Sequence, residues 1–268
     1  MRVSKQTFWS CICLSIVVLA IGAFQARAED WKNTIAAVVL NDRLYTVEKS
    51  GALYGTDLTT GKWVQIGKAE FSKTRFLFAG NQNLLSIETD GSLYRINPAN
   101  GAWVGLGKAG EWKATVDGTF LGGKLYTADS NGGLYETNPA TGAWRQIGKP
   151  DFAATRHLFN NGDLLYSIES DGSLYRIKPS DGTWSRAKEA GGWKNTMGST
   201  VMGDKLYTVE TSGVLYETSL VTGLWKPIGK AEFGKTRFLF SANGSLFTLE
   251  DGGLYRVNRS TGDWTQVG

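Results

Sequence analysis

The sequence predicts an all-β protein, a six-bladed β-propeller with four antiparallel strands in each blade, from three observations. First, one unit recurs six times, marked by a tryptophan after a glycine-containing turn, at intervals of 40, 41, 40, 41 and 39 residues. Second, each unit holds four short apolar segments separated by turn residues, which is typical of propeller blades. Third, no segment keeps a 3.6-residue apolar period, so a helical solenoid is excluded. The marker residues are Trp63, Trp103, Trp144, Trp184, Trp225 and Trp264.

The first unit shows how the four strands are recognised. The run Ile35–Leu40 is apolar throughout and ends at a polar turn, as expected of a strand buried on both faces. The segment Leu44–Glu48 is rich in β-branched and aromatic residues, and a glycine turn closes it. The third and fourth strands are then expected over Ala52–Thr56 and Lys62–Gly67.

The turns between strands carry glycine where a tight hairpin requires a positive φ angle. Gly91 and Gly172 are expected to close the hairpin between the second and third strands of their units. Gly101 and Gly182 take the same role in the following turn. These glycines therefore fix where each strand ends.

A second, longer period joins the units in pairs. Units one, three and five open with Trp-Lys-x-Thr, whereas units two, four and six open with Phe-x-x-Thr-Arg. The glutamates Glu88, Glu169 and Glu250 are each 81 residues apart. The chain is therefore predicted to be three tandem two-blade modules that close into one ring. Two closures remain open: the first and last blades lie side by side, or a strand is swapped between them.

Residues 1–28 are expected to form a signal peptide that is not part of the fold. Arg2 and Lys5 precede an apolar stretch over residues 12–24, and Ala26–Ala28 has the small-x-small pattern of a signal-peptidase site. The apolar stretch is short for a membrane span, although an uncleaved anchor is the alternative. The propeller domain is then predicted over residues 29–268, secreted or periplasmic, with no membrane span after cleavage.

Charge and cysteine content narrow the range of partners. The whole chain has 29 basic and 25 acidic residues, and the expected signal peptide holds Arg2, Lys5 and Arg27 but no acid. The remainder is close to neutral and shows no basic run, so a nucleic-acid partner is not expected. Both cysteines, Cys11 and Cys13, lie in the signal peptide, so the domain is expected to contain no disulfide.

The sequence argues against an enzyme, and no catalytic residue, metal or cofactor is predicted. The single histidine, His157, takes the place of Phe76 and Phe238 in related units, which favours a packing position over a catalytic base. A zinc site lacks ligands. An acidic residue recurs before the hairpin turn of each unit, either as an acceptor for turn N–H groups, as a rim residue, or as an acceptor for ligand hydroxyls. These residues are Glu48, Glu88, Asp129, Glu169, Glu210 and Glu250.

The residues that open each unit are the predicted binding positions, because they lie in connections between blades. A flat tryptophan beside hydrogen-bond donors suits a pyranose ring, and inter-blade packing is the other interpretation. The marker tryptophans, in contrast, are expected to pack in or on the blades. The arginine that starts alternate inner strands offers five donors, either to a ligand or to a recurring glutamate of a neighbouring blade. The predicted ligand-binding residues are Trp31, Asn33, Arg75, Trp112, Arg156, Trp193, Asn195 and Arg237.

Two kinds of segment resemble the tachylectin-2 family of lectins. Phe71–Phe78 and Phe233–Phe240 resemble that family's W-x-x-F-K-F-L-F inner strand, and Trp184–Trp193 is similar to its W-x-x-A…G-G-W connection. The outer half of the unit, as in Leu134–Trp144, looks equally like kelch or tectonin repeats. The resemblance implies sugar sites between neighbouring blades that recognise N-acetylated hexosamines. The units here are shorter than in that family, and there are six where it has five.

The sequence therefore predicts an exported propeller that binds glycans without catalysis through several equivalent sites, whose combined avidity exceeds the affinity of one site. One alternative is a kelch-like interaction scaffold that holds a protein ligand on one face. Another is a quinoprotein- or lyase-type propeller enzyme, which the Thr-Gly-x-Trp turns suggest and the lack of histidines disfavours.

Overall fold

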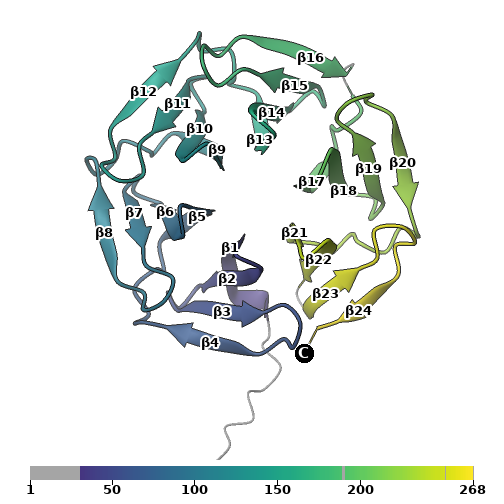
Figure 1. Cartoon of the computed structure of the whole chain (residues 1–268), viewed down its shortest axis with the longest axis horizontal. Helices are drawn as coiled ribbons and strands as arrows, with labels where there is room; N and C mark the ends of the chain where they lie inside the picture. Colours follow the sequence, from purple (N-terminus) through teal and green to yellow (C-terminus); the bar gives the residue numbers. More distant parts are fainter. Residues whose placement is uncertain (1–30, 189–190, 251, 268) are drawn as a thin grey trace, which may run out of the picture.

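The computed structural model describes residues 31–188, 191–250 and 252–267. The expected signal peptide, residues 1–28, lies outside these ranges. The described residues form six four-stranded antiparallel sheets arranged as blades around a central channel (Figure 1). The predicted fold class, an all-β six-bladed propeller with four antiparallel strands per blade, is confirmed.

Each blade consists of four consecutive strands in simple meander order. A short 3₁₀ helix, η1 (Trp31–Asn33), precedes the first blade. Blade 1 contains β1 (Thr34–Leu40), β2 (Arg43–Glu48), β3 (Leu53–Asp57) and β4 (Trp63–Ile66). Blade 2 contains β5 (Thr74–Gly80), β6 (Asn83–Glu88), β7 (Leu93–Ile96) and β8 (Trp103–Leu106). Blade 3 contains β9 (Thr115–Leu121), β10 (Lys124–Asp129), β11 (Leu134–Thr137) and β12 (Trp144–Ile147).

The second half of the chain repeats this plan. Blade 4 contains β13 (Thr155–Asn161), β14 (Leu164–Glu169), β15 (Leu174–Ile177) and β16 (Trp184–Lys188). Blade 5 contains β17 (Thr196–Met202), β18 (Lys205–Glu210), β19 (Leu215–Ser219) and β20 (Trp225–Ile228). Blade 6 contains β21 (Phe238–Ala242), β22 (Ser245–Glu250), β23 (Gly253–Val257) and β24 (Trp264–Gln266).

The core lies between the blades, which pack face to face. The second strand of a blade is covered on both faces, so that β6 and β10 are buried along all but their first residue. This explains why apolar residues stand at consecutive positions, as in Leu84–Leu85 and Leu125–Tyr126, instead of alternating strictly with polar ones. Apolar clusters join the sheets of neighbouring blades, and one of them combines Leu134 of blade 3 with Leu158 of blade 4.

The ring closes with blades 1 and 6 side by side, because β1–β4 and β21–β24 form separate sheets and no strand is exchanged. Leu44 of blade 1 shares an apolar cluster with Phe240 and Phe247 of blade 6. Arg237 donates hydrogen bonds to the carbonyl oxygens of Trp31 at 2.9 Å and Lys32 at 3.0 Å, and to that of Thr34. The N–H of Asn243 in blade 6 also donates to Oδ1 of Asp42 in blade 1 at 3.1 Å. Closure therefore rests on apolar packing, on Arg237 and on this hydrogen bond.

A backbone hydrogen bond links each of several blades to the next through a turn glycine. The N–H of Trp112, which opens blade 3, donates to the carbonyl oxygen of Gly91 in blade 2 at 3.1 Å. Gly91 has a φ of 84°, and a Cβ atom there would lie 2.5 Å from the nitrogen of Lys113. Only glycine fits such a close approach with this φ angle. The predicted positive φ at this turn is thus confirmed, and it serves contact between blades.

Candidate binding crevices and the central channel

Crevices occur at the outer part of three successive blades, and the same four positions line each of them. These positions are the aromatic residue that opens the unit, the recurring acid, a tyrosine of the third strand and the marker tryptophan. The crevices measure about 250 Å³ in blade 3, 150 Å³ in blade 4 and 190 Å³ in blade 5. Pockets for drug-sized ligands span roughly 300–1,000 Å³, so each crevice suits a single small ring. The four positions are Trp112, Asp129, Tyr135 and Trp144 in blade 3, Phe152, Glu169, Tyr175 and Trp184 in blade 4, and Trp193, Glu210, Tyr216 and Trp225 in blade 5.

The tryptophans that open alternate blades are buried against the preceding blade. Trp31, Trp112 and Trp193 are only 5%, 3% and 5% exposed. Trp112 packs with Phe78 and Leu85 of blade 2, which corresponds to the inter-blade packing interpretation. Trp112 and Trp193 also line crevices, so they form walls of these sites and do not offer an open stacking face.

The marker tryptophans are the aromatic residues with open surface in these crevices. Trp144 is 46% exposed and Trp225 is 60% exposed. Each contacts the tyrosine of the neighbouring strand edge to face, with ring centroids 5.3 Å apart in both Tyr135–Trp144 and Tyr216–Trp225. These tryptophans pack on the blade as the sequence predicted. The tyrosine contact also fixes each indole in place while about half of it stays exposed. Sequence reasoning missed this second property.

The recurring acid accepts a hydrogen bond from the threonine that begins the inner strand, and the two residues are always 14 positions apart. Thr115 donates to Asp129 at 3.2 Å, and Thr155 donates to Glu169 at 2.9 Å. This partner is neither a turn N–H group nor water, and the constant separation of the two residues was the sequence signal that could have revealed it. The other pairs are Thr34–Glu48, Thr74–Glu88, Thr196–Glu210 and Thr236–Glu250.

These acids are buried, and burial acts on their pKa. Burial raises the pKa of Asp129, Glu169 and Glu210 above the ordinary value, while the threonine hydroxyls oppose that rise. In Glu169 both protein donors, Thr155 and Ser167, reach the same oxygen, Oε1. Within the described residues Oε2 of Glu169 accepts no hydrogen bond, so it is available to a ligand hydroxyl.

Blades 2, 4 and 6 differ from the other three in the partner of the marker indole. The indole N–H of Trp184 donates to Asp151 at 3.0 Å, in the connection that opens its own blade. In the described part of the chain the indole N–H groups of Trp144 and Trp225 have no such acceptor. The corresponding bonds in blades 2 and 6 are Trp103–Glu70 and Trp264–Glu232, each 3.1 Å.

The crevices of blades 3 and 5 also contain hydroxyl groups without partners. The Oγ1 atoms of Thr127 and Thr218 are buried and have no hydrogen-bond partner among the described residues, and both threonines line a crevice. A buried hydroxyl without a partner costs about 1–3 kcal/mol, so such groups usually meet water or a ligand. In blade 4 the hydroxyl equivalent to that of Thr127, in Ser167, is already bonded to Glu169, and the apolar Ile177 takes the place of Thr218. Blades 3 and 5 therefore hold unused donors and acceptors.

The predicted arginines connect blades. Arg156 donates to the carbonyl oxygens of Lys194 at 2.6 Å and Thr196 at 2.5 Å in the next blade, and Arg75 makes the equivalent bonds to Lys113 and Thr115. The arginine charge also acts on a recurring acid. Arg156 lowers the pKa of Glu210, but burial raises that pKa by more. The tie between blades expected from the sequence thus runs mainly through backbone carbonyls. A ligand-binding role for these arginines stays a prediction.

The two predicted asparagines lie exposed in connections that open blades 1 and 5. The carbonyl oxygen of Asn33 accepts the N–H of Lys49 at 2.8 Å, and that of Asn195 accepts the N–H of Thr211 at 2.9 Å. Asn195 also lines the crevice of blade 5 beside Trp193. The structure therefore brings together two of the predicted residues in blade 5.

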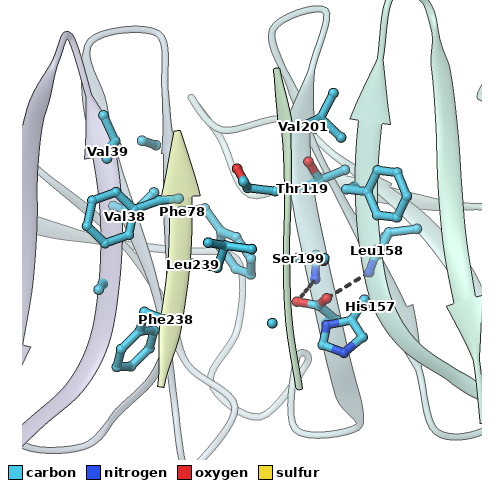
Figure 2. Close-up of a pocket in the computed structure, with 18 of the residues that line it drawn as sticks. Val38, Val39, Phe78, Thr119, His157, Leu158, Ser199, Val201, Phe238 and Leu239 are labelled. Atoms are coloured by element: carbon cyan, nitrogen blue, oxygen red, sulfur yellow. Dashed lines mark hydrogen bonds between the residues drawn. The ribbon is translucent and has the colours of Figure 1, made fainter. Parts of the chain in front are cut away.

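The central channel, about 790 Å³, is lined by the inner strands of all six blades. Figure 2 shows Val38, Val39 and Phe238 on one side of it and His157 and Ser199 on the other. The polar side chains come mainly from blades 3, 4 and 5, whereas blades 1, 2 and 6 contribute mostly apolar residues. Unlike the crevices, the channel is therefore not symmetric.

Asp117 interrupts the repeat in this channel. Its oxygens accept the N–H groups of Gly118 at 2.8 Å and of Leu158, in the next blade, at 2.7 Å. Burial raises the pKa of Asp117 from 3.8 to about 7, although both hydrogen bonds oppose this rise. In the adjacent blade Nε2 of His157 lies 3.4 Å from the carbonyl oxygen of Thr196. Burial lowers the pKa of His157. His157 thus lines the channel, partly buried, as Phe76 and Phe238 do at the equivalent positions.

Replacing Asp117 by asparagine is expected to make stability less dependent on pH. The folded-state pKa of about 7 lies above the ordinary 3.8, so the folded protein binds this proton more tightly than the unfolded chain. The free energy of unfolding contributed by this group therefore falls as the pH rises from about 4 to about 7. Urea unfolding at pH 4 and pH 8 should show the variant gaining stability relative to the wild type across this interval. A constant difference would contradict the raised pKa.

Comparison with known proteins identifies the family to which the repeats of this chain belong. The family PQQ_2, described as outer membrane protein assembly factor BamB, matches residues 89–226. The match covers more than half of the chain, and the chain belongs to this family. The protein is therefore a six-bladed β-propeller with a BamB-type repeat domain. No curated protein matches the chain by sequence.

Solved structures share the fold at low sequence identity. The computationally designed Ika8 protein is 14% identical with a TM-score of 0.55, covering 88% of this chain and 74% of its own. PorZ, a surface component of the type-IX secretion system of Porphyromonas gingivalis, is 16% identical with a TM-score of 0.60, covering 88% and 33%. The extracellular domain of BT4673, a putative one-component system from B. thetaiotaomicron, is 13% identical with a TM-score of 0.60, covering 88% and 36%. The chain thus spans about a third of the two natural proteins.

Proposed function

We propose that the protein binds glycans without catalysis, and that the sugar rings enter the crevices of blades 3 and 5 and bind at the equivalent residues of blade 1. The observation that carries this proposal is the set of unused polar groups in crevices walled by aromatic rings. A pyranose presents an apolar C–H face and several hydroxyls. The half-exposed indole of Trp144 or Trp225 suits that face, and the hydroxyls of Thr127 and Thr218 suit the polar edge.

Blade 1 is included because it carries the same residues at the equivalent positions. Thr46 and Thr56 have buried hydroxyls without partners within the described chain, as Thr127 and Thr137 do in blade 3. Tyr54 contacts Trp63 edge to face with centroids 4.7 Å apart. Three weak sites on one rigid ring would bind a multivalent glycan far more tightly than each site alone.

A glycan array probed with the full-length protein tests this proposal. The expected result is selective binding to glycans with repeated terminal or branched sugar residues, such as N-acetylated hexosamines, and no change in the glycans after prolonged incubation. Absence of binding to every glycan would contradict the proposal, and release of shortened products would show an enzyme instead.

A protein-interaction scaffold is the second candidate, and one surface feature favours it. Val221 and Leu224, in the turn between β19 and β20, are 79% and 70% exposed beside Trp225. Such an apolar group at an exposed turn suits contact with another protein. The family description, an outer membrane protein assembly factor, points the same way. Under this alternative the array shows no glycan signal.

The proposed location is the periplasm or the cell exterior. The expected signal peptide over residues 1–28 supports export, and the family description names a factor that acts on outer membrane proteins. Among the described residues no helix has the length and apolarity needed to cross a bilayer.

A further inference from the structure

The central channel departs from the repeat, whereas the crevices follow it. The marker tryptophan and the recurring acid are present in every unit, but equivalent positions of the inner strands carry different kinds of side chain. The third residue of the inner strand is Ala36 in blade 1 and Phe76 in blade 2, yet it is Asp117 in blade 3 and His157 in blade 4. The departure from the repeat therefore falls on the channel wall.

The channel is divided along its length into a polar wall and an apolar wall. The polar wall consists of β9, β13 and β17, the inner strands of the consecutive blades 3, 4 and 5, and the apolar wall consists of β21, β1 and β5. Figure 2 shows Val38 and Phe238 of the apolar wall across the channel from His157 and Ser199 of the polar wall. The partly exposed side chains of the polar wall include Asp117, Thr119, His157, Asn160, Asn161 and Ser199.

The apolar wall offers a ligand mainly hydrocarbon. All the residues that line the channel from β1, over Ile35–Val39, are apolar, and Phe76 and Phe238 are partly exposed beside them. The polar residues of this wall are held by neighbouring blades. Arg75 and Arg237 donate to backbone carbonyl oxygens of the next blade, and Ser241 donates to the carbonyl oxygen of Val201 at 2.9 Å.

The polar wall, in contrast, has hydrogen-bonding capacity to spare. Asn160 accepts the hydroxyl of Thr119 at 2.8 Å through Oδ1, but its Nδ2 group has no partner among the described residues. The side chains of Asn161 and Ser199 also form no hydrogen bond within the described chain. Each oxygen of Asp117 accepts one backbone N–H group, whereas a carboxylate can accept about four hydrogen bonds in all. Donors and acceptors are thus available on one side of the channel.

The channel is also much larger than a crevice. Its volume is about 790 Å³, within the range of roughly 300–1,000 Å³ that is typical of preformed small-molecule sites. The inner strands of blades 1 to 5 have seven residues each and so extend over roughly 23 Å. A ligand that fills this space is longer than the single ring that suits a crevice, and it meets two different walls along its whole length.

We propose that the channel binds a rigid facial amphiphile, a fused polycyclic molecule such as a steroid alcohol whose hydroxyl groups project from one face. The hydroxyls would meet the polar wall while the hydrocarbon face packs on Val38, Phe76 and Phe238. A fatty acid is polar at one end only, so it would match a channel divided from end to end. A sugar carries hydroxyls around its whole edge, and those facing the apolar wall would lose their partners at a cost in free energy.

Two isomeric probes test this proposal by isothermal titration calorimetry below their micellar concentrations. Chenodeoxycholate and ursodeoxycholate share one skeleton and one carboxylate. In the first both hydroxyls project from the same face, whereas in the second they project from opposite faces. Chenodeoxycholate is expected to bind about tenfold more tightly, because the misplaced hydroxyl of its isomer is left without a partner against the apolar wall. Equal binding of the two isomers, or binding of neither, would overturn the proposal.

A double variant locates the preference on the polar wall. Asn160→Ala and Ser199→Ala give β13 and β17 the residues that β5 and β1 carry at the equivalent positions, Ala79 and Ala37, so the fold should tolerate them. The variant is expected to bind both isomers with similar affinity. A preference that survives unchanged would show that the hydroxyls do not meet this wall, and the proposal would fail.

A matched control separates the channel from the crevices. Trp144→Ala and Trp225→Ala remove side chains of the crevices and leave the channel intact, so the preference for chenodeoxycholate should persist. Loss of bile salt binding in this control would place the steroid in the crevices and overturn the proposal. The channel variant, in turn, should retain glycan binding, so that either site can fail without the other.

Discussion

Alanine in place of Trp63, Trp144 and Trp225 is expected to abolish glycan binding, reducing apparent affinity for a multivalent glycan by at least about 100-fold. Each substitution removes an indole against which a sugar ring is proposed to pack, half-exposed in Trp144 and Trp225 and more buried in Trp63. The loss of apparent affinity is large because the three sites bind the same multivalent glycan together. Surface plasmon resonance on an immobilised glycan that is positive on the array measures this effect.

The chain offers a matched control for this prediction. Trp103, Trp184 and Trp264 occupy the same strand position and make the same edge-to-face contact with a tyrosine. Their indole N–H groups are already bonded to acids of the connections that open their own blades. Alanine at these three positions removes equal aromatic area and should retain most of the binding. Equal losses in the two triple variants would refute the distinction between the two sets of blades.

Replacing Arg237 by alanine is expected to lower the free energy of unfolding by roughly 3 kcal/mol. The guanidinium satisfies the carbonyl oxygens of Trp31, Lys32 and Thr34 across the closure between blades 6 and 1. No chain connection between the last and first blades supplements these bonds, because each blade is built from its own four strands. Urea unfolding measures the loss, and hydrogen exchange of β1 and β21 amides shows whether the closure opens first.

Arg145 provides the comparison for this variant. It is also an arginine on a strand, but its side chain is exposed and pairs only with Glu136 at 3.2 Å. An exposed ion pair contributes about 0.2–1 kcal/mol, so Arg145→Ala should change stability little. If Arg237→Ala were no more costly than Arg145→Ala, closure would not depend on the arginine, and apolar packing with the Asn243–Asp42 hydrogen bond would hold it.

The fold could be predicted from the sequence because the same pattern occurs six times. Tryptophan spacing, turn glycines and apolar second strands all point to one blade, and each unit repeats them. Side-by-side closure could not be chosen in advance, since the sequence contains six complete units under either arrangement. The contacts of Arg237 with Trp31 and Lys32, over 200 residues away, decide it only in three dimensions.

The candidate site was predictable in position more than in detail. The opening tryptophans were expected in the site, and Trp112 and Trp193 do line crevices, but the preceding blade buries them. The difference between alternate blades follows the alternation of Trp-Lys-x-Thr and Phe-x-x-Thr-Arg openings, but these openings do not reveal the partner of the marker indole. Glu111 precedes Trp112 just as Glu70 precedes Phe71, yet Glu111 accepts the N–H of Lys108 while Glu70 accepts the indole of Trp103.

The number of sugar ligands bound by one chain tests most directly whether the repeated crevices are the binding sites. Native mass spectrometry with a short oligosaccharide that is positive on the array should show up to three ligands per protein. That number should fall by one with each of Trp63→Ala, Trp144→Ala and Trp225→Ala. A single ligand per chain that survives all three substitutions would place recognition in the channel or elsewhere and contradict the repeated crevices as the binding sites.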